Sequence, residues 1–285
     1  MKNSFLVLSI VIVSILSCKQ SEDSGVKELA EPKRQSPKAI AFQVENAKQW
    51  LLTHKTDSAH KAIAYAVNRT DSANFAQMDS VVIPADLTGD IEFYLPFPLK
   101  VNYLRDIQKI IFFSYPTQTF ATYENGILIY TGPTNMGRQK DMTPTGLSFT
   151  NWKAEETTST FNDEWDLRWN FNIQNKEGIG WHQYSLPGFP ASHSCLRLQE
   201  KDAKYLFEWA DQWELGEQDS VLVKGTPVIV FGSYDFVAPK PWLQLIVDPH
   251  ALDIKEEAIQ KETMPFLSEI LTAQKNRETF LASKP

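Results

Sequence analysis

A single cysteine in the second half of the chain lies close to two histidines. Cys195 follows His193 by two residues and His182 by thirteen, within "HQYSLPGFPASHSCLRL" at 182–198. A thiol of ordinary pKa is mostly protonated at neutral pH, and a neighbouring imidazole can accept its proton to give a thiolate that attacks carbonyl groups. These residues predict a cysteine nucleophile with His182 as a candidate base, while His193 is a candidate supporting residue.

Two other interpretations of these residues stay open. Cys195 can be an inert buried thiol with the two histidines as ordinary loop residues. Alternatively, His182, His193 and Cys195 can be zinc ligands, although their spacing is not one of the familiar zinc patterns and a fourth, carboxylate ligand is not evident.

The other cysteine, Cys18, ends a segment typical of a secretion signal. Lys2 precedes the apolar run "FLVLSIVIVSILS", which is too short to span a bilayer. Its end, "ILSC", resembles the lipobox of bacterial lipoproteins, in which the cysteine receives lipid and becomes the mature N-terminus. We therefore expect 1–17 to be a signal peptide and Cys18 the lipidation site. The alternative is a plain cleaved signal.

This interpretation predicts export, with a lipid anchor at Cys18 on the periplasmic side of the cell envelope, in the outer membrane. Cys195 then has no partner for an intramolecular disulfide. Removal of residues 1–17 also removes Lys2, so the formal charge changes from -7 to -8. Such an acidic chain argues against nucleic acid as a partner. The sequence predicts no oligomeric state.

Strand patterns surround the cysteine. From residue 107, "QKIIFFSYPTQTFATYENGILIYTGPTNMG" predicts three strands, with a turn at Tyr115 and Pro116 and a reversal at Asn125 and Gly126. Further strands are predicted in "TPTGLSFTNW", "GIGWHQY" and "GTPVIVFGSY". A helix in "EKDAKYLFEWADQW" follows the cysteine directly. The region is therefore strand-rich, with one helix behind the cysteine.

Helical patterns flank this region. After a flexible polar tether at 18–38, the spacing of apolar residues predicts two short helices near the start of an N-terminal extension at 39–106. A C-terminal tail at 235–285 carries two more helical patterns, at roughly 252–262 and 264–282. We interpret the tail as packing or spacer, which leaves 107–234 as the catalytic domain.

Several segments together resemble one known family. "SHSCLRL" is similar to the S/T-H-G-C-h-R signature, where h is hydrophobic, of the L,D-transpeptidase (YkuD-like) family, and His182 lies where that family carries its catalytic histidine. "QTFATYENGILIYTGPTNMG", "TPTGLSF" and "GTPVIV" resemble its opening hairpin, its T-P-x-G-x-F segment and its closing strand. The resemblance covers roughly 107–232. It implies a mainly β fold with a few helices (α+β), a sandwich or barrel whose cysteine loop leads into a helix, with helical extensions at both ends.

The resemblance also implies residue roles. Cys195 is the nucleophile, His182 is the base that forms an ion pair with it, and His193 and Arg197 support them. Backbone N–H groups around Ser194 and Cys195 form the oxyanion hole. Ser192 is expected to hydrogen-bond within the loop. Two positions depart from the family pattern, because Ser194 replaces the motif glycine and Gln183 replaces the glycine that commonly follows the histidine.

Members of this family act on peptidoglycan stem peptides without a metal or organic cofactor. The resemblance implies that Cys195 attacks the L-centre carbonyl of the third stem-peptide residue, releases D-Ala and transfers the acyl group from the tetrapeptide donor to an amine acceptor, which gives a 3-3 crosslink. The alternatives are an L,D-carboxypeptidase or amidase on the same substrate, or a catalytically inactive wall-binding lipoprotein.

The segment 151–184 carries four tryptophans between the T-P-x-G strand and the catalytic histidine. We expect it to form a lid in which Trp165 and Trp169 exclude water and grip the acyl peptide, which would favour transfer over hydrolysis. The alternative is that these tryptophans only pack the insertion onto the sheet.

Overall fold

The computed structural model describes residues 31–158 and 166–284. The predicted signal peptide at 1–17, the lipidation site Cys18 and the lid residue Trp165 lie outside the described residues. No helix in the described part of the chain is long and apolar enough to cross a membrane.

A five-stranded sheet contains the strands predicted from the alternating pattern. Its order is β5-β4-β3-β13-β6. The strands are β3 (Ile110–Ser114), β4 (Thr119–Glu124), β5 (Ile127–Pro133), β6 (Gly146–Phe149) and β13 (Pro227–Phe231). Asn125 and Gly126 have φ of 46° and 79°, the left-handed conformations that a tight hairpin turn requires at both central positions. The predicted reversal therefore lies between β4 and β5.

A second, four-stranded sheet has the order β10-β9-β8-β7. It consists of β7 (Lys153–Thr158), β8 (Asp166–Gln174), β9 (Ile179–Gln183) and β10 (Leu196–Leu198). The pairs β7–β8 and β8–β9 are antiparallel, whereas β10 runs parallel to β9. The tryptophan-bearing segment 151–184 therefore supplies three of the four strands.

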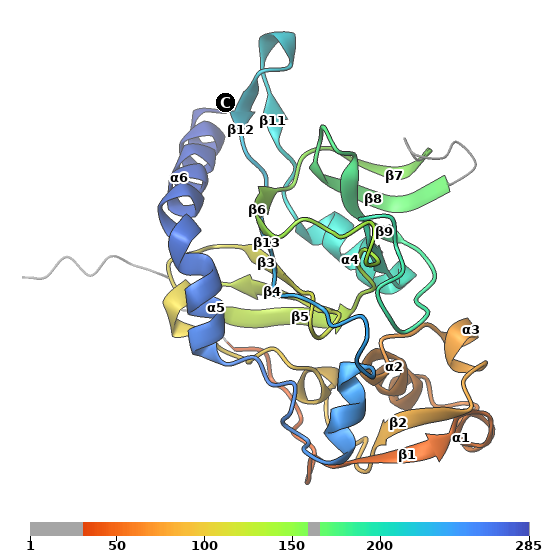
Figure 1. Cartoon of the computed structure of the whole chain (residues 1–285). Coiled ribbons are helices and arrows are strands. Elements are labelled where there is room, and N and C mark those ends of the chain that lie inside the picture. Colours follow the sequence, from red (N-terminus) through yellow and green to blue (C-terminus); the bar gives the residue numbers. More distant parts are fainter. Residues whose placement is uncertain (1–30, 159–165, 285) are drawn as a thin grey trace, which may run out of the picture. The chain divides into compact units, whose positions relative to one another are not determined.

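The main core lies between the two sheets and helix α4 (Glu200–Trp209). Phe113 and Val230 from the first sheet meet Phe171 and Trp181 from the second, and Leu206 of α4 joins them. Apolar residues from two sheets and one helix share this core, which confirms the α+β fold class (Figure 1).

The C-terminal segment packs on the opposite face of the five-stranded sheet. Helices α5 (Glu256–Thr263) and α6 (Leu267–Ser283) place Ile259 and Ile270 against Ile110 and Phe112 of β3 (Figure 1). The short 3₁₀ helix η5 (Met264–Phe266) contains Pro265 and joins them. The tail is thus a packing element, one of the two roles expected for it.

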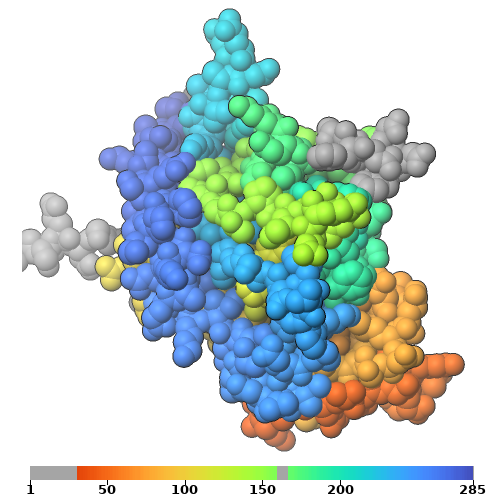
Figure 2. Space-filling view, in the orientation of Figure 1, coloured from red at the N-terminus to blue at the C-terminus, as the bar shows by residue number. Residues whose placement is uncertain are grey.

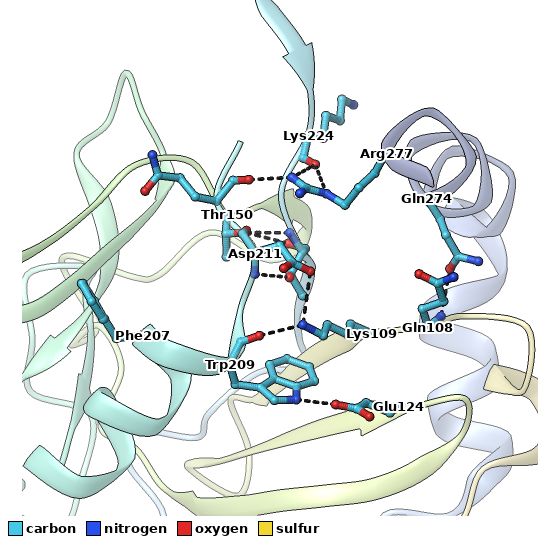
Figure 3. A network of polar contacts seen from close by, with 12 residues as sticks. Gln108, Lys109, Glu124, Thr150, Phe207, Trp209, Asp211, Lys224, Gln274 and Arg277 are labelled. Atoms are coloured by element: carbon cyan, nitrogen blue, oxygen red, sulfur yellow. Dashed lines mark hydrogen bonds and ion pairs between the residues drawn. The ribbon is translucent and has the colours of Figure 1, made fainter. Parts of the chain in front are cut away.

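Polar contacts near the start of the inner strands β3 and β13 tie helices α6 and α4 to this sheet (Figure 3). Gln108 N donates to Gln274 Oε1 of α6 at 2.9 Å, and Arg277 Nη2 donates to Lys224 O at 2.8 Å. On the α4 side, Lys109 Nζ donates to Trp209 O at 2.9 Å. The end of α4 is therefore held by Lys109, just before β3, and α6 is held by Gln108 before β3 and by Lys224 before β13.

The N-terminal extension contains the two predicted helices, α1 (Ala47–Thr53) and α2 (Ser58–Val67), and a further short helix, α3 (Ser72–Phe75). It also contains an antiparallel pair, β1 (Phe42–Asn46) and β2 (Ser80–Pro84). The helices expected in this extension are therefore present, together with a strand pair that was not predicted. The sequence "SVVIP" is rich in β-branched residues, which favour strands.

The remaining elements are short. A hairpin of β11 (Glu214–Leu215) and β12 (Val221–Val223) follows α4. The other 3₁₀ helices are η1 (Ile91–Tyr94), η2 (Asn102–Leu104), η3 (Glu217–Asp219) and η4 (Pro241–Ile246).

Candidate active site

The parallel pairing of β9 and β10 brings the two main candidate residues together. In this register Leu196 pairs with Trp181 and Arg197 pairs with His182. Cys195 immediately precedes β10, so His182 lies diagonally across the strand pair from it. The twelve residues between His182 and Cys195 therefore form a loop that leads the chain back beside β9, as the prolines and glycine of this segment predicted.

Strand alternation places these side chains on one face. Trp181 and Leu196 belong to the core between the sheets. Because successive side chains of a strand point to opposite faces, His182, Arg197 and the preceding Cys195 share the face away from that core. The positions of Cys195 and His182 suit a nucleophile and its base.

His182 is held in one orientation by the backbone. Its side chain is buried, and Nδ1 lies 3.0 Å from Gln183 O. Since a carbonyl oxygen only accepts, Nδ1 carries the proton and Nε2 of the neutral ring is left as the acceptor. Burial lowers the pKa of His182 to about 4, and the charge of Arg197 acts in the same direction. The ring is therefore a neutral base at pH 7.

The Cys195 thiol also favours its neutral form. Burial raises its pKa, whereas a backbone hydrogen bond from Gly180 and the charge of Arg197 oppose this shift. Sγ lies 4.0 Å from Gly178 O. Within the described residues, Cys195 Sγ and His182 Nδ1 each donate to a backbone carbonyl, that of Gly178 and that of Gln183. Burial therefore favours the uncharged thiol and imidazole over the ion pair that the resemblance implies, because it penalises both charges.

The loop before Cys195 has the backbone shape that the motif glycine would favour. Ser194 has φ of 79°, a left-handed conformation that costs a non-glycine residue about 1 kcal/mol or more. Its Oγ donates to Asp141 O at 3.2 Å, and Ser192 Oγ donates to Cys195 O at 2.5 Å. The expected hydrogen bond of Ser192 within the loop is therefore present.

Two further hydrogen bonds of this loop use its carbonyl groups. Thr143 Oγ1 donates to Ser194 O at 2.7 Å, and Arg138 N donates to Ser192 O at 3.0 Å. In the described part of the chain, none of these bonds uses the N–H of Ser194 or Cys195. Both N–H groups can therefore serve an oxyanion.

Thr143 connects the loop with a neighbouring segment, a role that sequence reasoning missed. Besides its bond to Ser194 O, Thr143 Oγ1 accepts from Gly137 N at 2.9 Å. Tyr115 Oη in turn donates to Gly137 O at 2.5 Å. The T-P-x-G segment marks the position of Thr143, but that pattern gives no indication of its partners.

Arg197 and His193 are the two supporting residues expected from the motif. Arg197 Cζ lies 4.4 Å from the centroid of the Tyr184 ring, and no carboxylate forms an ion pair with this guanidinium among the described residues. His193 is half-buried in the loop. Burial lowers its pKa, as does the charge of Arg138, while Asp141 opposes them. Arg197 thus adds positive charge beside the thiol.

The end of helix α2 is bonded to the segment that follows His182. Thr70 Oγ1 donates to Leu186 O at 2.9 Å, and Leu186 N donates to Asp71 Oδ2 at 2.7 Å. Asp71 also caps α3, because its Oδ1 accepts from Asn74 N at 2.8 Å. The sequence can indicate the cap, but it gives no sign of a partner 115 residues away.

Asn135, which follows β5, hydrogen-bonds to β10, to the end of α2 and to the loop after His182. Its backbone exchanges two hydrogen bonds with Arg197, at 3.1 and 3.0 Å. Its side chain accepts from Gly188 N at 3.1 Å and donates to Arg69 O at 3.1 Å. Asn135 is wholly buried. The N-terminal extension therefore supports, partly through Asn135, strand β10 and the loop that joins the candidate catalytic residues.

The described tryptophans of the expected lid take structural positions. Trp181 is wholly buried in the core. Trp169 packs against the same core from β8, with its ring 5.5 Å from that of Phe207 in α4. This is the face opposite Cys195, so the position of Trp169 favours the packing interpretation. Trp152 donates through Nε1 to Asn175 Oδ1 at 3.0 Å.

Metal ligation was the other open interpretation of the two histidines and the cysteine. Across residues 31–158 and 166–284, no group of three or more histidine, cysteine, aspartate or glutamate side chains is arranged to hold a metal ion.

Comparison with known proteins identifies the family of this region. Residues 108–230 match the family model of YkuD, the L,D-transpeptidase catalytic domain. The match includes Cys195, His182 and the strands β3 to β13. It confirms the family resemblance found in the sequence. No curated protein matches the chain.

Solved structures of L,D-transpeptidases are also similar to this chain. One from Stackebrandtia nassauensis is 24% identical, with 45% of this chain and 57% of that chain covered and a TM-score of 0.36. One from Mycobacterium smegmatis is 19% identical, with 44% and 59% covered and a TM-score of 0.35. One from Mycobacterium tuberculosis H37Rv is 19% identical, with 44% and 58% covered and a TM-score of 0.35. The chain thus spans less than two thirds of each.

Proposed function

We propose that the chain is a cysteine-dependent peptidoglycan L,D-transpeptidase. The observation that carries this proposal is the position of Cys195 and His182 on one face of two adjoining parallel strands, within the region that matches the family model. The substrate class is taken from the family. The tetrapeptide stem is the acyl donor, and an amine of a second stem is the acceptor.

Acylation begins with a neutral thiol. Cys195 Sγ attacks the L-centre carbonyl of the third stem-peptide residue while His182 Nε2 accepts the thiol proton. The N–H groups of Ser194 and Cys195 stabilise the oxyanion that forms. The imidazolium then gives its proton to the leaving amine, and D-Ala departs from a thioester on Cys195.

Deacylation runs the same steps with an amine as nucleophile. The acceptor amine attacks the thioester carbonyl, and His182 Nε2 takes a proton from it. Collapse of the tetrahedral intermediate forms the 3-3 amide bond and returns the proton to Cys195 Sγ. If water replaces the amine, the product is a free tripeptide.

Gln183 O has a part in both steps. Its contact with Nδ1 fixes the tautomer in which Nε2 accepts the proton, and it stabilises the imidazolium when the ring becomes charged. A neutral resting pair means that proton transfer accompanies attack, as in general base catalysis.

We further propose that the protein is exported and lipid-anchored through Cys18 in the cell envelope, on the periplasmic side of the outer membrane. The support is the apolar run that ends in "ILSC". Substitution Cys18→Ala should abolish the incorporation of labelled palmitate. Equal labelling of both proteins would exclude this anchor.

The activity is tested with the chain lacking its first 18 residues, incubated with purified tetrapeptide muropeptides. Mass spectrometry should detect a 3-3 crosslinked dimer and free D-Ala with the wild type, and neither product with Cys195→Ala. His182→Ala should lose most of the activity. Free tripeptide as the only product, with abundant acceptor, would identify an L,D-carboxypeptidase. No product at all would favour a wall-binding role.

A further inference from the structure

Arg197 has unused hydrogen-bond donors beside the proposed nucleophile. The residue is half-buried, so part of its side chain reaches the surface. Among the described residues, no hydrogen bond or ion pair uses its guanidinium N–H groups, and Cζ lies 4.4 Å from the centroid of the Tyr184 ring. A guanidinium presents its N–H donors in a planar fork that matches a carboxylate. Arg197 can therefore bind an anionic group that enters from solvent.

The charge of Arg197 is not balanced by a carboxylate in the described part of the chain. Burial lowers the pKa of Arg197, and the charge of Arg138 acts in the same direction, while Tyr184 and Cys195 oppose them. Asp141, in the neighbouring segment, is already paired with Arg138, with Oδ2 2.5 Å from Nε. A half-buried cation without a counter-ion favours a negatively charged ligand.

The parallel strand pair places this guanidinium on the same face as the candidate catalytic residues. Arg197 pairs with His182 in the register of β9 and β10, and adjoining strands lie about 4.8 Å apart. Cys195 precedes Arg197 by two residues, which is about 6.6 Å along an extended strand. Figure 2 shows the loop 183–194, in teal, at the surface between the yellow-green segment around residue 140 and the orange N-terminal extension. Arg197 therefore adjoins both the proposed nucleophile and the proposed base.

The proposed reaction brings a carboxylate to this position. His182 gives its proton to the leaving amine, so the nitrogen of the departing D-Ala lies beside His182 and hence beside Arg197. The terminal carboxylate carbon is two bonds beyond that nitrogen, within about 3 Å of it. In a stem with an amidated end, or with a fifth residue, a neutral amide would take the place of this carboxylate.

We propose that Arg197 binds the terminal carboxylate of the acyl donor and makes the enzyme selective for stems that end in a free D-Ala carboxylate. This inference rests on the proposed transpeptidase function and names the group of the donor that is recognised. The guanidinium donates two parallel N–H···O bonds to the carboxylate. Tyr184 is a positioning residue, because its ring supports the guanidinium.

The bound carboxylate also favours proton transfer. The charge of Arg197 contributes to the low pKa of His182. A carboxylate that neutralises this charge raises the pKa of His182 and so stabilises the imidazolium that forms during acylation. A donor without the carboxylate should therefore show a lower kcat as well as a higher KM.

The first experiment compares two donors that differ only at the terminus, the tetrapeptide and the same peptide with its terminal carboxylate converted to an amide. With excess acceptor, the wild type should have a kcat/KM at least tenfold higher for the free carboxylate. Arg197→Met should bring this ratio close to one, and Arg197→Lys should give an intermediate ratio, because lysine keeps the charge without the fork. A change in the thiol pKa would affect both donors alike. A wild-type ratio near one, or an unchanged ratio in Arg197→Met, would overturn the proposal.

Two further positions separate binding from general electrostatics and from structure. Lys140→Met removes an exposed positive charge from the neighbouring segment and should leave the ratio close to that of the wild type. An equal fall in Lys140→Met and Arg197→Met would contradict the proposal. Tyr184→Ala should lower the ratio and Tyr184→Phe should retain it, since phenylalanine keeps the ring. A wild-type ratio in Tyr184→Ala would refute the positioning role. If Arg197→Met does not fold, Arg197→Lys and the wild-type ratio decide.

Binding measured without turnover distinguishes this inference from the proposed function. In Cys195→Ala, calorimetry should show the tetrapeptide binding at least tenfold more tightly than its amide, and the additional change Arg197→Met should remove the difference. Selective binding without any turnover by the wild type would refute the transpeptidase function and support the carboxylate site. Equal turnover of both donors would support the function and refute the site. Neither turnover nor selective binding would refute both.

Discussion

At the level of single residues, burial works against the charges that catalysis must create. In the proposed mechanism Cys195 must become an anion and His182 a cation, yet the environment raises the pKa of Cys195 and lowers the pKa of His182. Arg197 stabilises a thiolate and destabilises an imidazolium. The substrate's tetrahedral oxyanion, held by N–H groups, is then the charge that makes proton transfer favourable.

Alkylation of Cys195 tests this electrostatic picture. The rate with iodoacetamide should rise with pH and inflect above the value of an ordinary cysteine, because burial raises the thiol pKa. Arg197→Met should move the inflection to still higher pH, since it removes a charge that stabilises the thiolate, while Arg197→Lys should move it less. A rate that is already maximal at pH 6 would mean a preformed ion pair instead.

The backbone at Ser194 gives a second prediction at this scale. Ser194→Gly should fold with a stability within about 1 kcal/mol of the wild type and keep its activity, because glycine adopts positive φ without strain. Ser194→Val should lose activity at least tenfold, since β-branched residues are the least suited to this conformation. Urea denaturation and the muropeptide assay provide the measurements. Equal activity of the two variants would show that the loop backbone does not depend on this φ.

At the level of elements, the parallel pair of β9 and β10 positions the candidate catalytic residues, and other segments support this pair. The short strand β10 has β9 on one side and Asn135 on the other. The end of α2 holds the connecting loop through Leu186. The position of His182 relative to Cys195 therefore depends on residues before 108, outside the region that matches the family model.

Two aspartates that cap helices allow this dependence to be measured. Asp71→Asn keeps an oxygen for the cap of α3 but removes one that accepts from Leu186 N. We expect kcat/KM to fall about tenfold and the fold to persist. Asp57→Asn is the matched control. Asp57 caps α2 by accepting from His60 N, and within the described residues it forms no hydrogen bond with the loop 183–194. If both variants lose activity equally, the loss reflects helix capping alone.

At the level of the whole molecule, a buried carboxyl group couples stability to pH. Asp202 is wholly buried in the first turn of α4, where Oδ1 accepts from Tyr130 Oη at 2.6 Å. Oδ2 is buried without a hydrogen-bond partner in the described structure. Burial raises the pKa of Asp202 to about 6. The folded protein therefore holds the proton of this carboxyl group more tightly than the unfolded chain does.

The sign of this coupling is opposite to that of a carboxylate in a salt bridge. The contribution of Asp202 to the free energy of unfolding is fully present below the pKa that this residue has in the unfolded chain, near pH 4. It is lost as pH rises through about 6, the pKa in the folded protein. This loss amounts to roughly 3 kcal/mol. Asp202→Asn should therefore be more stable than wild type at pH 7 and closer to it at pH 4. Urea unfolding of both proteins from pH 4 to 7 measures the difference, and a constant difference across that range would refute the assignment.

The sequence alone determined the elements whose signals are local. Alternating apolar residues predicted β3, β4 and β5, and Asn125 with Gly126 predicted their reversal, because only a few residue types adopt positive φ readily. The cysteine motif and His182 likewise gave the resemblance to the family whose model matches residues 108–230, because such a motif lies in a short stretch of sequence.

Only the tertiary structure decided which distant segments meet. The bonds of Asn135 to Arg69 and Gly188, and of Asp71 to Leu186, join residues far apart in the chain, and no local pattern encodes such pairs. The role of Gln183 O was equally hidden, because every residue has a carbonyl group. Burial, which depends on the whole fold, favours the uncharged forms of Cys195 and His182. The contact of Trp169 with Phe207 of α4 likewise exists only in the folded chain.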